Sequence, residues 1–234
     1  MKTESLLDKA DANLGRRSFL RYAAAGMAGA GVLAAGACTK GDPYYDNLGK
    51  RQPYDIGPVG DFAILNYAYA LEQLEAAFYT QVVANMYTGA SADEIAMFKD
   101  IRDHEIAHRE FFKLALGANA MESLTPDFGA VNFTSKASVV ATAQAFEDLG
   151  VSAYNGAGYL IKSADYLLIA GKIVSVEARH AAYIRNLANP GSFADGTILD
   201  GFGMDKTNTI AGVLKIANGF LKTKISAREY GYTA

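Results

Sequence analysis

103-DHEIAHREFF-112 and 174-VSVEARHAAY-183 carry the same short pattern, a glutamate followed three residues later by a histidine. The pairs are Glu105 with His108 and Glu177 with His180. Chance predicts only about 0.1 such pairs in a chain of this composition. On a helix, residues three apart are neighbours, about 5–6 Å from each other. Each pair can therefore aim a carboxylate and an imidazole at one point.

The segments around these pairs are long runs of residues that favour helices, and in no stretch do apolar and polar residues alternate convincingly with a period of two. The sequence therefore predicts an all-α chain. Asp61 is expected to be the N-cap of the first helix, and Ser91 with Glu94 to form a capping box at the start of the second. The predicted helices cover residues 61–89, 91–117, 135–161, 165–188 and, more weakly, 207–224.

The lengths of the connections favour one arrangement of these helices. Short turns join the first helix to the second and the third to the fourth, so each pair should form an antiparallel hairpin. The segment 118–134 is a long connection between the hairpins. One long crossover between two hairpins is typical of the ferritin-like four-helix bundle. We therefore predict such a bundle over residues 61–190, followed by a C-terminal loop and helix over 191–234.

The first and third helices complete the pattern. Glu72 is followed seven residues later by Tyr79, and Glu147 is followed seven residues later by Tyr154. Seven residues make two turns, so each tyrosine lies on the same face as its glutamate. The two hairpins thus repeat one layout, with offsets of 75 residues for the first and third helices and 72 for the second and fourth. Facing each other, they would bring four glutamates and two histidines together.

Charge indicates what such a cluster would be for. Four carboxylates in an apolar core repel one another and lose their hydration. Two divalent cations would cancel the four negative charges and accept neutral imidazoles. The metal-free alternative, in which some glutamates stay protonated, is a costly way to build a core.

These residues resemble the dinuclear carboxylate site of the ferritin-like superfamily, which includes ferritins, rubrerythrins and manganese catalases. The sequence as a whole most resembles the exported bacterial ferritin-like domain family described as desiccation-related. The resemblance implies two iron ions, with manganese as the alternative. It also implies that Glu105 and Glu177 bridge the metals and that Glu72 and Glu147 bind one metal each. One histidine would bind each metal, and Tyr79 and Tyr154 would be hydrogen-bond partners of the ligands.

Three nearby residues have simpler interpretations. Glu75 could replace Glu72 as a ligand, but the tyrosine spacing favours Glu72 and leaves Glu75 as a polar position at the edge of a face. His104 has no counterpart in the fourth helix, where Val176 stands at the equivalent place, so it is expected to be solvated or to contact the ligands from outside. Asp148 is expected to lie on a solvated face.

The N-terminus predicts export. Arg16 and Arg17 precede Phe19, Leu20 and a weakly apolar run rich in alanine and glycine, which resembles a twin-arginine (Tat) signal peptide over residues 1–37. Cys38 ends this run, as in a lipobox, although Ala35 stands where leucine is usual. The alternative is simple cleavage after a small-x-small motif. Residues 38–60 would then be the lipidated cysteine and a linker, placing the protein in the periplasm or cell envelope, with a possible lipid anchor to a membrane.

Composition narrows the function further. The net charge is −3 and no basic run follows the N-terminus, so no nucleic-acid partner is expected. Carboxylate-rich sites with two imidazoles suit iron or manganese. The sequence therefore predicts a redox-active metalloprotein acting on Fe(II) with oxygen or peroxide, a ferroxidase-like or peroxide-consuming oxidoreductase, with manganese-catalase-like activity as a variant. The alternative is a non-catalytic envelope protein that uses the bundle for structure or to bind a partner. The oligomeric state is open, with a homodimer as one option.

Overall fold

The computed structural model describes residues 54–234, and all structural statements below refer to that part of the chain. Within it the ordered elements are helical, and β pairing is limited to isolated bridges. The α-helices are α2 (Asp61–Ala84), α3 (Ala92–Leu116), α4 (Lys136–Ala157), α5 (Ala164–Ala188) and α6 (Ile210–Ala217). Short 3-10 turns follow three of them directly: η2 (Gly117–Asn119), η3 (Gly158–Leu160) and η4 (Asn218–Phe220). A further one, η5 (Arg228–Tyr230), lies near the C-terminus.

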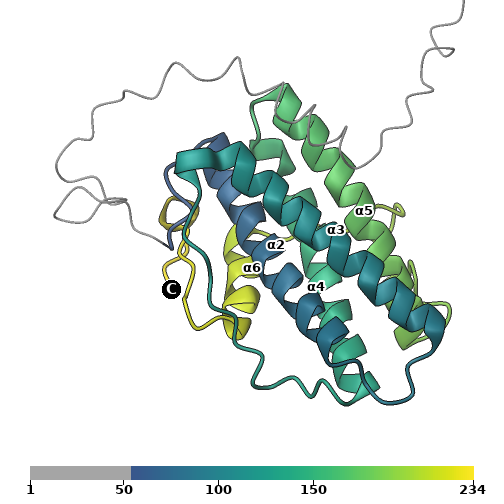
Figure 1. Ribbon diagram of the computed structural model, residues 1–234. Helices are drawn as coiled ribbons and strands as arrows, with labels where there is room; N and C mark the ends of the chain where they lie inside the picture. The colour runs from purple at the N-terminus through teal and green to yellow at the C-terminus, as the bar shows by residue number, and fades with distance from the viewer. Residues whose placement is uncertain (1–53) are drawn as a thin grey trace, which may run out of the picture. The chain divides into compact units, whose positions relative to one another are not determined.

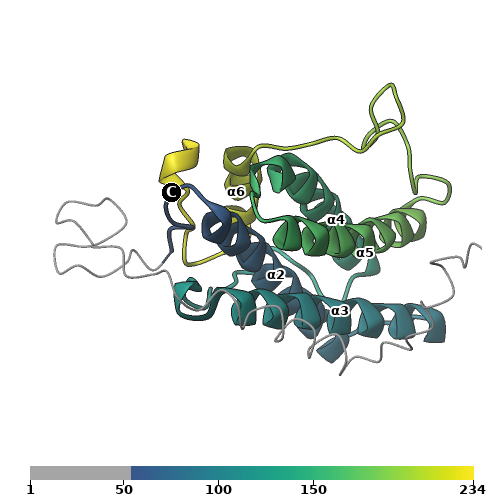
Figure 2. The same cartoon turned by 90° about the horizontal axis from the view of Figure 1, so that it is seen from above.

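Two antiparallel hairpins, α2–α3 and α4–α5, form the bundle (Figure 1). Residues 117–135 run along the side of the bundle from the end of α3 to the start of α4, so α3 and α4 point the same way (Figure 1). Viewed from above, the hairpins form two layers, and α6 lies beside α2 and α4 (Figure 2). The prediction of two hairpins joined by a long crossover, with a C-terminal helix added, is therefore confirmed.

Helix boundaries differ from the predicted ones mainly at C-terminal ends. α2 ends at Ala84 rather than near Gly89, because the Asn85 N–H donates to the carbonyls of Gln81 and Val82 and closes the helix. Gly89 instead sits in the following turn with φ +82°, a conformation that favours glycine. α4 similarly ends at Ala157 and passes into η3. Helix ends fray more readily than helix centres, so sequence locates them least well.

The two predicted helix starts have different outcomes. Ser91 and Glu94 form the expected capping box at the start of α3. Asp61, in contrast, is not an N-cap, because Gly60 occupies that position and no side chain caps the helix. The Asp61 carboxylate accepts hydrogen bonds from the backbone N–H groups of Lys162 and Ser163, at 2.7 and 3.0 Å. It therefore ties the start of α2 to the turn before α5.

α2 is the central helix of the bundle. Most of its residues are buried on every side, because α3, α4 and α6 all pack against it. This explains why its sequence shows apolar residues all round rather than a narrow stripe. A polar side chain in the middle of this helix therefore lies inside the molecule.

The C-terminal segment closes one flank of the bundle. The Asn208 N–H donates to the Ser152 carbonyl at 3.0 Å, which places the entry to α6 against α4. At Gly156 a Cβ atom would lie 1.8 Å from the Asn208 carbonyl oxygen. Only glycine allows this approach of two backbones.

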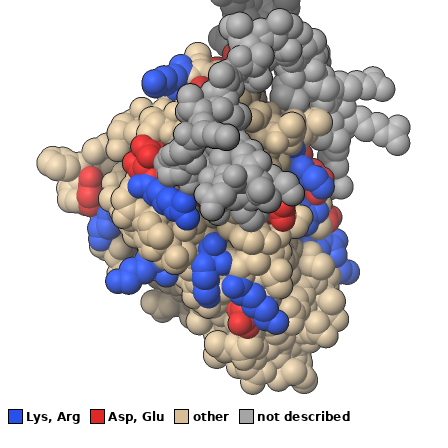
Figure 3. All heavy atoms as spheres, turned by 90° about the vertical axis from the view of Figure 1, so that its left-hand side faces the viewer, with Lys and Arg blue, Asp and Glu red and all other residues tan. Residues whose placement is uncertain are grey.

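Several predictions concern residues outside 54–234: the signal peptide over 1–37, Cys38 and the linker as far as residue 53. Among the described residues, no helix has both the length and the apolar character needed to cross a membrane. On the face seen in Figure 3, basic and acidic side chains are interspersed on an otherwise uncharged surface.

Candidate metal centre

All six predicted ligand residues lie in the interior, and each bundle helix contributes at least one of them. Glu72, Glu105, Glu147 and Glu177 have no exposed surface, while His108 is 8% and His180 5% exposed. They are positioned by the middle of their helices, where the backbone is held by regular hydrogen bonds. The structure therefore brings together the residues that the repeated layout of the two hairpins singles out.

These residues form two overlapping groups of four. In each group, one ligand atom per residue lies within 4.8 Å of the others. One group is Glu72, Glu105, His108 and Glu177, and the other is Glu105, Glu147, Glu177 and His180. Glu105 and Glu177 belong to both groups, and the other four residues belong to one each.

The two shared carboxylates turn one oxygen toward each histidine. Glu105 Oε2 lies 3.8 Å from His108 Nδ1, and Glu105 Oε1 lies 2.9 Å from His180 Nδ1. Glu177 Oε1 lies 2.8 Å from His108 Nδ1, and Glu177 Oε2 lies 3.6 Å from His180 Nδ1. This is the arrangement in which a carboxylate can bridge two cations.

The two unshared carboxylates each face one histidine. Glu72 Oε2 lies 3.4 Å from His108 Nδ1, and Glu147 Oε2 lies 3.5 Å from His180 Nδ1. Their other oxygens accept hydrogen bonds from tyrosines of the opposite hairpin: Tyr154 donates to Glu72 Oε1 at 2.5 Å, and Tyr79 donates to Glu147 Oε1. Each tyrosine thus crosses the bundle and orients the glutamate of the other half, rather than the glutamate on its own helix.

Several polar atoms at the centre of the cluster are buried and have no well-aligned hydrogen-bond partner within residues 54–234, although imidazole and carboxylate atoms approach each other as closely as 2.8 Å. They are Glu72 Oε2, both oxygens of Glu105, His108 Nδ1, Glu147 Oε2, both oxygens of Glu177 and His180 Nδ1. Native proteins rarely leave so many buried polar atoms unsatisfied. Each histidine points its Nδ1 at carboxylate oxygens of its own group. A cation placed among the atoms of one group would have four ligand atoms, one from each residue. The residues present fit two metal ions.

The pKa values of the clustered residues also indicate that the cluster needs added positive charge, because burial and mutual repulsion disfavour several negative charges together. Burial and the Glu177 charge raise the pKa of Glu105 to about 8, and burial raises the pKa of Glu147 to about 7. Burial would also raise the pKa of Glu177, but the two imidazoles lower it to about 2. Burial opposes the charged form of His108 and His180, yet the surrounding carboxylates raise both pKa values. Without metal, protons must supply the positive charge that the cluster needs.

His104 touches the cluster from outside on one side only. The ring is exposed, and its Nδ1 lies 2.9 Å from His180 Nε2, with the two rings nearly parallel at 7°. This contact leaves His180 Nδ1 free to face the carboxylates. Val176 occupies the equivalent position in α5, so the two halves differ here. His104 therefore has the outer contact that was one of its two expected roles.

Glu75 was interpreted as a polar position at an edge, and that interpretation is wrong. Its side chain is buried, because α2 is enclosed on all sides, and burial together with the charges of Glu105 and Glu177 raises its pKa well above the usual range. A Cβ at Gly150 would lie 3.2 Å from Glu75 Oε1. Gly150 is the counterpart of Glu75 in the repeat. Because glycine has no side chain, α4 leaves room at this position for the Glu75 carboxyl group of α2. The 75-residue offset, applied to Glu75, would have revealed this pair.

Asp148 is a second correction. It was expected on a solvated face, but it is only partly exposed, and its Oδ2 lies 2.6 Å from Nη1 of the buried Arg185. The Arg185 guanidinium also donates to the Ser192 carbonyl at 2.9 Å and pairs with Asp195 at 2.9 Å. This buried arginine anchors the loop after α5 to α4 and lies outside the six-residue cluster.

Comparison with known proteins agrees with this architecture. The family model described as a ferritin-like domain matches residues 60–190, which include all four bundle helices and all six clustered residues. No curated protein matches the chain. The chain belongs to the family of ferritin-like domain proteins.

Proposed function

We propose that this protein is an exported ferritin-like protein that holds two metal ions, iron or alternatively manganese, and oxidises Fe(II) with oxygen or consumes peroxide. The observation that supports it best is the pair of four-residue groups that share Glu105 and Glu177, with inward atoms that have no hydrogen-bond partner in the described part of the chain. Carboxylate oxygens and imidazole nitrogens suit iron and manganese. When bound, such metals supply one-electron redox chemistry toward dioxygen or peroxide.

The roles of the protein groups follow from their positions. Glu105 and Glu177 would bridge the two ions, because each turns one oxygen toward each histidine. Glu72 with His108 and Glu147 with His180 would bind one ion each.

Tyr154 and Tyr79 would hold the terminal carboxylates in place through their hydroxyl groups. Ligands fixed in this way tend to bind metal more tightly than mobile ones. Burial of the cluster would keep bulk water from the ions.

Export remains part of the proposal and depends on the N-terminal sequence. Arg16 and Arg17 would direct the folded protein, with metal already bound, through the twin-arginine route, and Cys38 would carry a lipid anchor in the cell envelope. Placement among the exported, desiccation-related ferritin-like proteins depends on the same segment. Mass spectrometry of the protein isolated from the envelope would give the cleavage site and any lipid on Cys38.

Elemental analysis of protein purified from its native envelope tests the metal site. Two iron or manganese ions per chain are expected, together with an optical change when the reduced protein meets oxygen or peroxide. Glu105→Gln should lose both, whereas Glu110→Gln, an exposed position on the same helix, should keep both. Metal that raises the melting temperature without any reaction toward either oxidant would favour the non-catalytic envelope protein. A protein without metal, in which Glu105→Gln changes nothing, would refute the proposal.

A further inference from the structure

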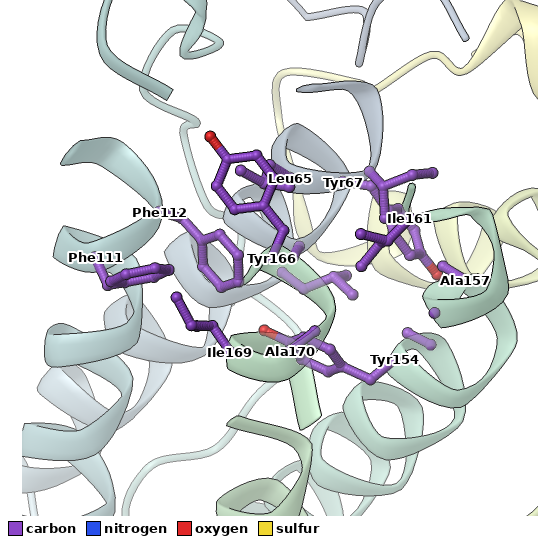
Figure 4. Close-up of a pocket in the computed structure, with 15 residues that line it drawn as sticks. Leu65, Tyr67, Phe111, Phe112, Tyr154, Ala157, Ile161, Tyr166, Ile169 and Ala170 are labelled. Carbon is purple, nitrogen blue, oxygen red and sulfur yellow. The ribbon is translucent and has the colours of Figure 1, made fainter. Parts of the chain in front are cut away.

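An apolar cavity of about 30 Å³ lies inside the bundle, at the end where α2 begins and α3 ends (Figure 4). Its lining comes from all four bundle helices and includes Phe112, Ala153, Tyr154, Tyr166, Ile169 and Ala170. Tyr166 and Ile169 are partly exposed, whereas Phe112 and Ala153 are buried. The cavity therefore extends from near the surface toward the interior.

The repeat between the hairpins explains why this end is hollow. The counterparts of Ala153 and Ala170, by the offsets of 75 and 72, are Phe78 and Phe98. Both phenylalanines are fully buried at the opposite end of the bundle. There the Phe78 ring centroid lies 5.1 Å from that of Tyr79, and the Phe98 centroid lies 6.2 Å from it. Two alanines thus leave empty the space that two aromatic rings fill in the other half.

The cavity adjoins one half of the metal centre. Tyr154, which forms part of its wall, donates its hydroxyl hydrogen bond to Glu72. Ala68 lines the cavity one helical turn before Glu72, and Phe112 lines it one turn after His108. A molecule in the cavity would therefore sit one layer of side chains from the group formed by Glu72 and His108.

The lining selects what can occupy this space. It presents almost no polar surface, and apolar cavities of this kind stay dry and take up apolar molecules. Roughly 10–15 Å³ on this measure holds one water molecule, so there is room for a molecule of two heavy atoms. Hydrogen peroxide has that size, but it would lose its hydrogen bonds to water on entry. Dioxygen has the size and loses none.

Tyr67 provides the strongest case for water instead. Tyr67 is part of the cavity wall, and its hydroxyl is buried and has no hydrogen-bond partner within residues 54–234. Buried water molecules typically make about three hydrogen bonds. A single hydroxyl offers fewer than that, so it does not turn this space into a water site.

We propose that this cavity is a binding site for dioxygen that supplies the Glu72–His108 side of the centre. The inference deepens the proposed function, on which it depends, because it names dioxygen rather than peroxide as the oxidant admitted by this route. It concerns binding and access only, and it assigns the site to residues of this chain that do not themselves contact metal.

Xenon, an apolar probe, tests the binding step without any reaction. Crystals of the full protein under xenon pressure should show xenon between Ala153 and Ala170. Ala170→Leu should remove it, and Ala153→Val serves as a smaller filling variant if the first one folds poorly. Ala141→Leu, at an exposed position on α4, is the matched control and should leave xenon bound. Absence of xenon from the wild-type cavity, or an ordered water on Tyr67 in its place, would overturn the proposal.

A kinetic comparison tests access. In the Fe(II)-loaded protein, Ala170→Leu should slow oxidation by dioxygen about tenfold, as expected when a reactant is no longer held beside the site. Oxidation by peroxide should stay within about twofold of wild type, because the change leaves the ligands intact. Equal slowing of both reactions would contradict the assignment. A wild-type protein that binds xenon here but reacts with neither oxidant would refute the proposed function, and with it the supply of dioxygen, while leaving an apolar cavity.

Discussion

At the scale of single residues, the sharpest consequence of the geometry is the difference between the two carboxylates that face both histidines and the two that face only one. Glu105 and Glu177 each face both histidines, whereas Glu72 and Glu147 each face one. We expect Glu177→Gln to abolish binding of both ions and Glu147→Gln to weaken mainly the ion on the His180 side. Metal stoichiometry, measured by elemental analysis after dialysis, distinguishes these outcomes. Equal losses from the two variants would argue against shared bridging ligands.

His104 provides a test of asymmetry between the two halves. Because its Nδ1 lies 2.9 Å from Nε2 of His180, His104→Val should weaken mainly the ion on the His180 side, roughly 10–100-fold, as is typical when a hydrogen bond to a ligand is lost. The companion variant Val176→His places a histidine at the equivalent position beside His108. Titration against a competing chelator measures both. If His104→Val leaves two equally tight ions, the contact does not position His180.

At the scale of secondary-structure elements, hydrogen bonds at the helix ends fix how the helices are placed against one another. Asp61 was predicted to start α2, but it accepts hydrogen bonds from the turn before α5, which is about a hundred residues away in sequence. Sequence patterns describe local capping well, as Ser91 and Glu94 show. They cannot reveal that a side chain at one helix end serves another helix, because that partner is chosen by tertiary packing.

Among the contacts between elements, those of Arg185 are expected to contribute most to the free energy of unfolding. It is buried on α5 and pairs with Asp148 on α4 and with Asp195 in the following loop. Removal of one partner from such a network typically costs about 3–5 kcal/mol, because the remaining charges lose their counter-charge. Asp195 is partly exposed, so we expect Arg185→Met to lower the free energy of unfolding toward the lower end of that range. Urea denaturation measures this.

The control for this experiment is Arg179→Met on the same helix. Arg179 is exposed, and changes at such positions usually alter stability by less than about 0.5 kcal/mol. The metal content of Arg185→Met should remain unchanged wherever the protein is folded. Loss of metal with unchanged stability would mean that the arginine acts on the centre rather than on the loop.

At the scale of the whole molecule, the metal-free protein should become less stable as pH rises between about 4.5 and 8. Glu105 and Glu147 have folded-state pKa values of about 8 and 7, above their usual 4.5. The folded state therefore binds more protons than the unfolded state in this window, and stability falls with pH. The raised pKa values of His108 and His180 act in the same direction. Glu177 acts oppositely, but only near pH 2–4.5.

Metal should reverse this dependence. Two divalent ions replace the protons, so metal affinity should rise with pH over the same window. We expect the difference in melting temperature between metal-loaded and metal-free protein to grow by at least several degrees from pH 5 to pH 8. Calorimetry at both pH values, with and without a chelator, measures it. A metal-free protein whose stability rises from pH 5 to pH 8 would mean that the cluster is not the dominant titrating group.

Local sequence alone determined the helices, the hairpin pairing and the grouping of six candidate ligand residues, because helical periodicity, loop length and a repeated spacing are properties of short segments. Tertiary structure decided which tyrosine orients which glutamate, that Glu75 is buried beside Gly150, that His104 contacts His180, and that alanines leave a cavity at one end. These features depend on contacts between helices that are distant in sequence. A spacing can place a side chain on a helix face, but only packing determines what lies opposite that face.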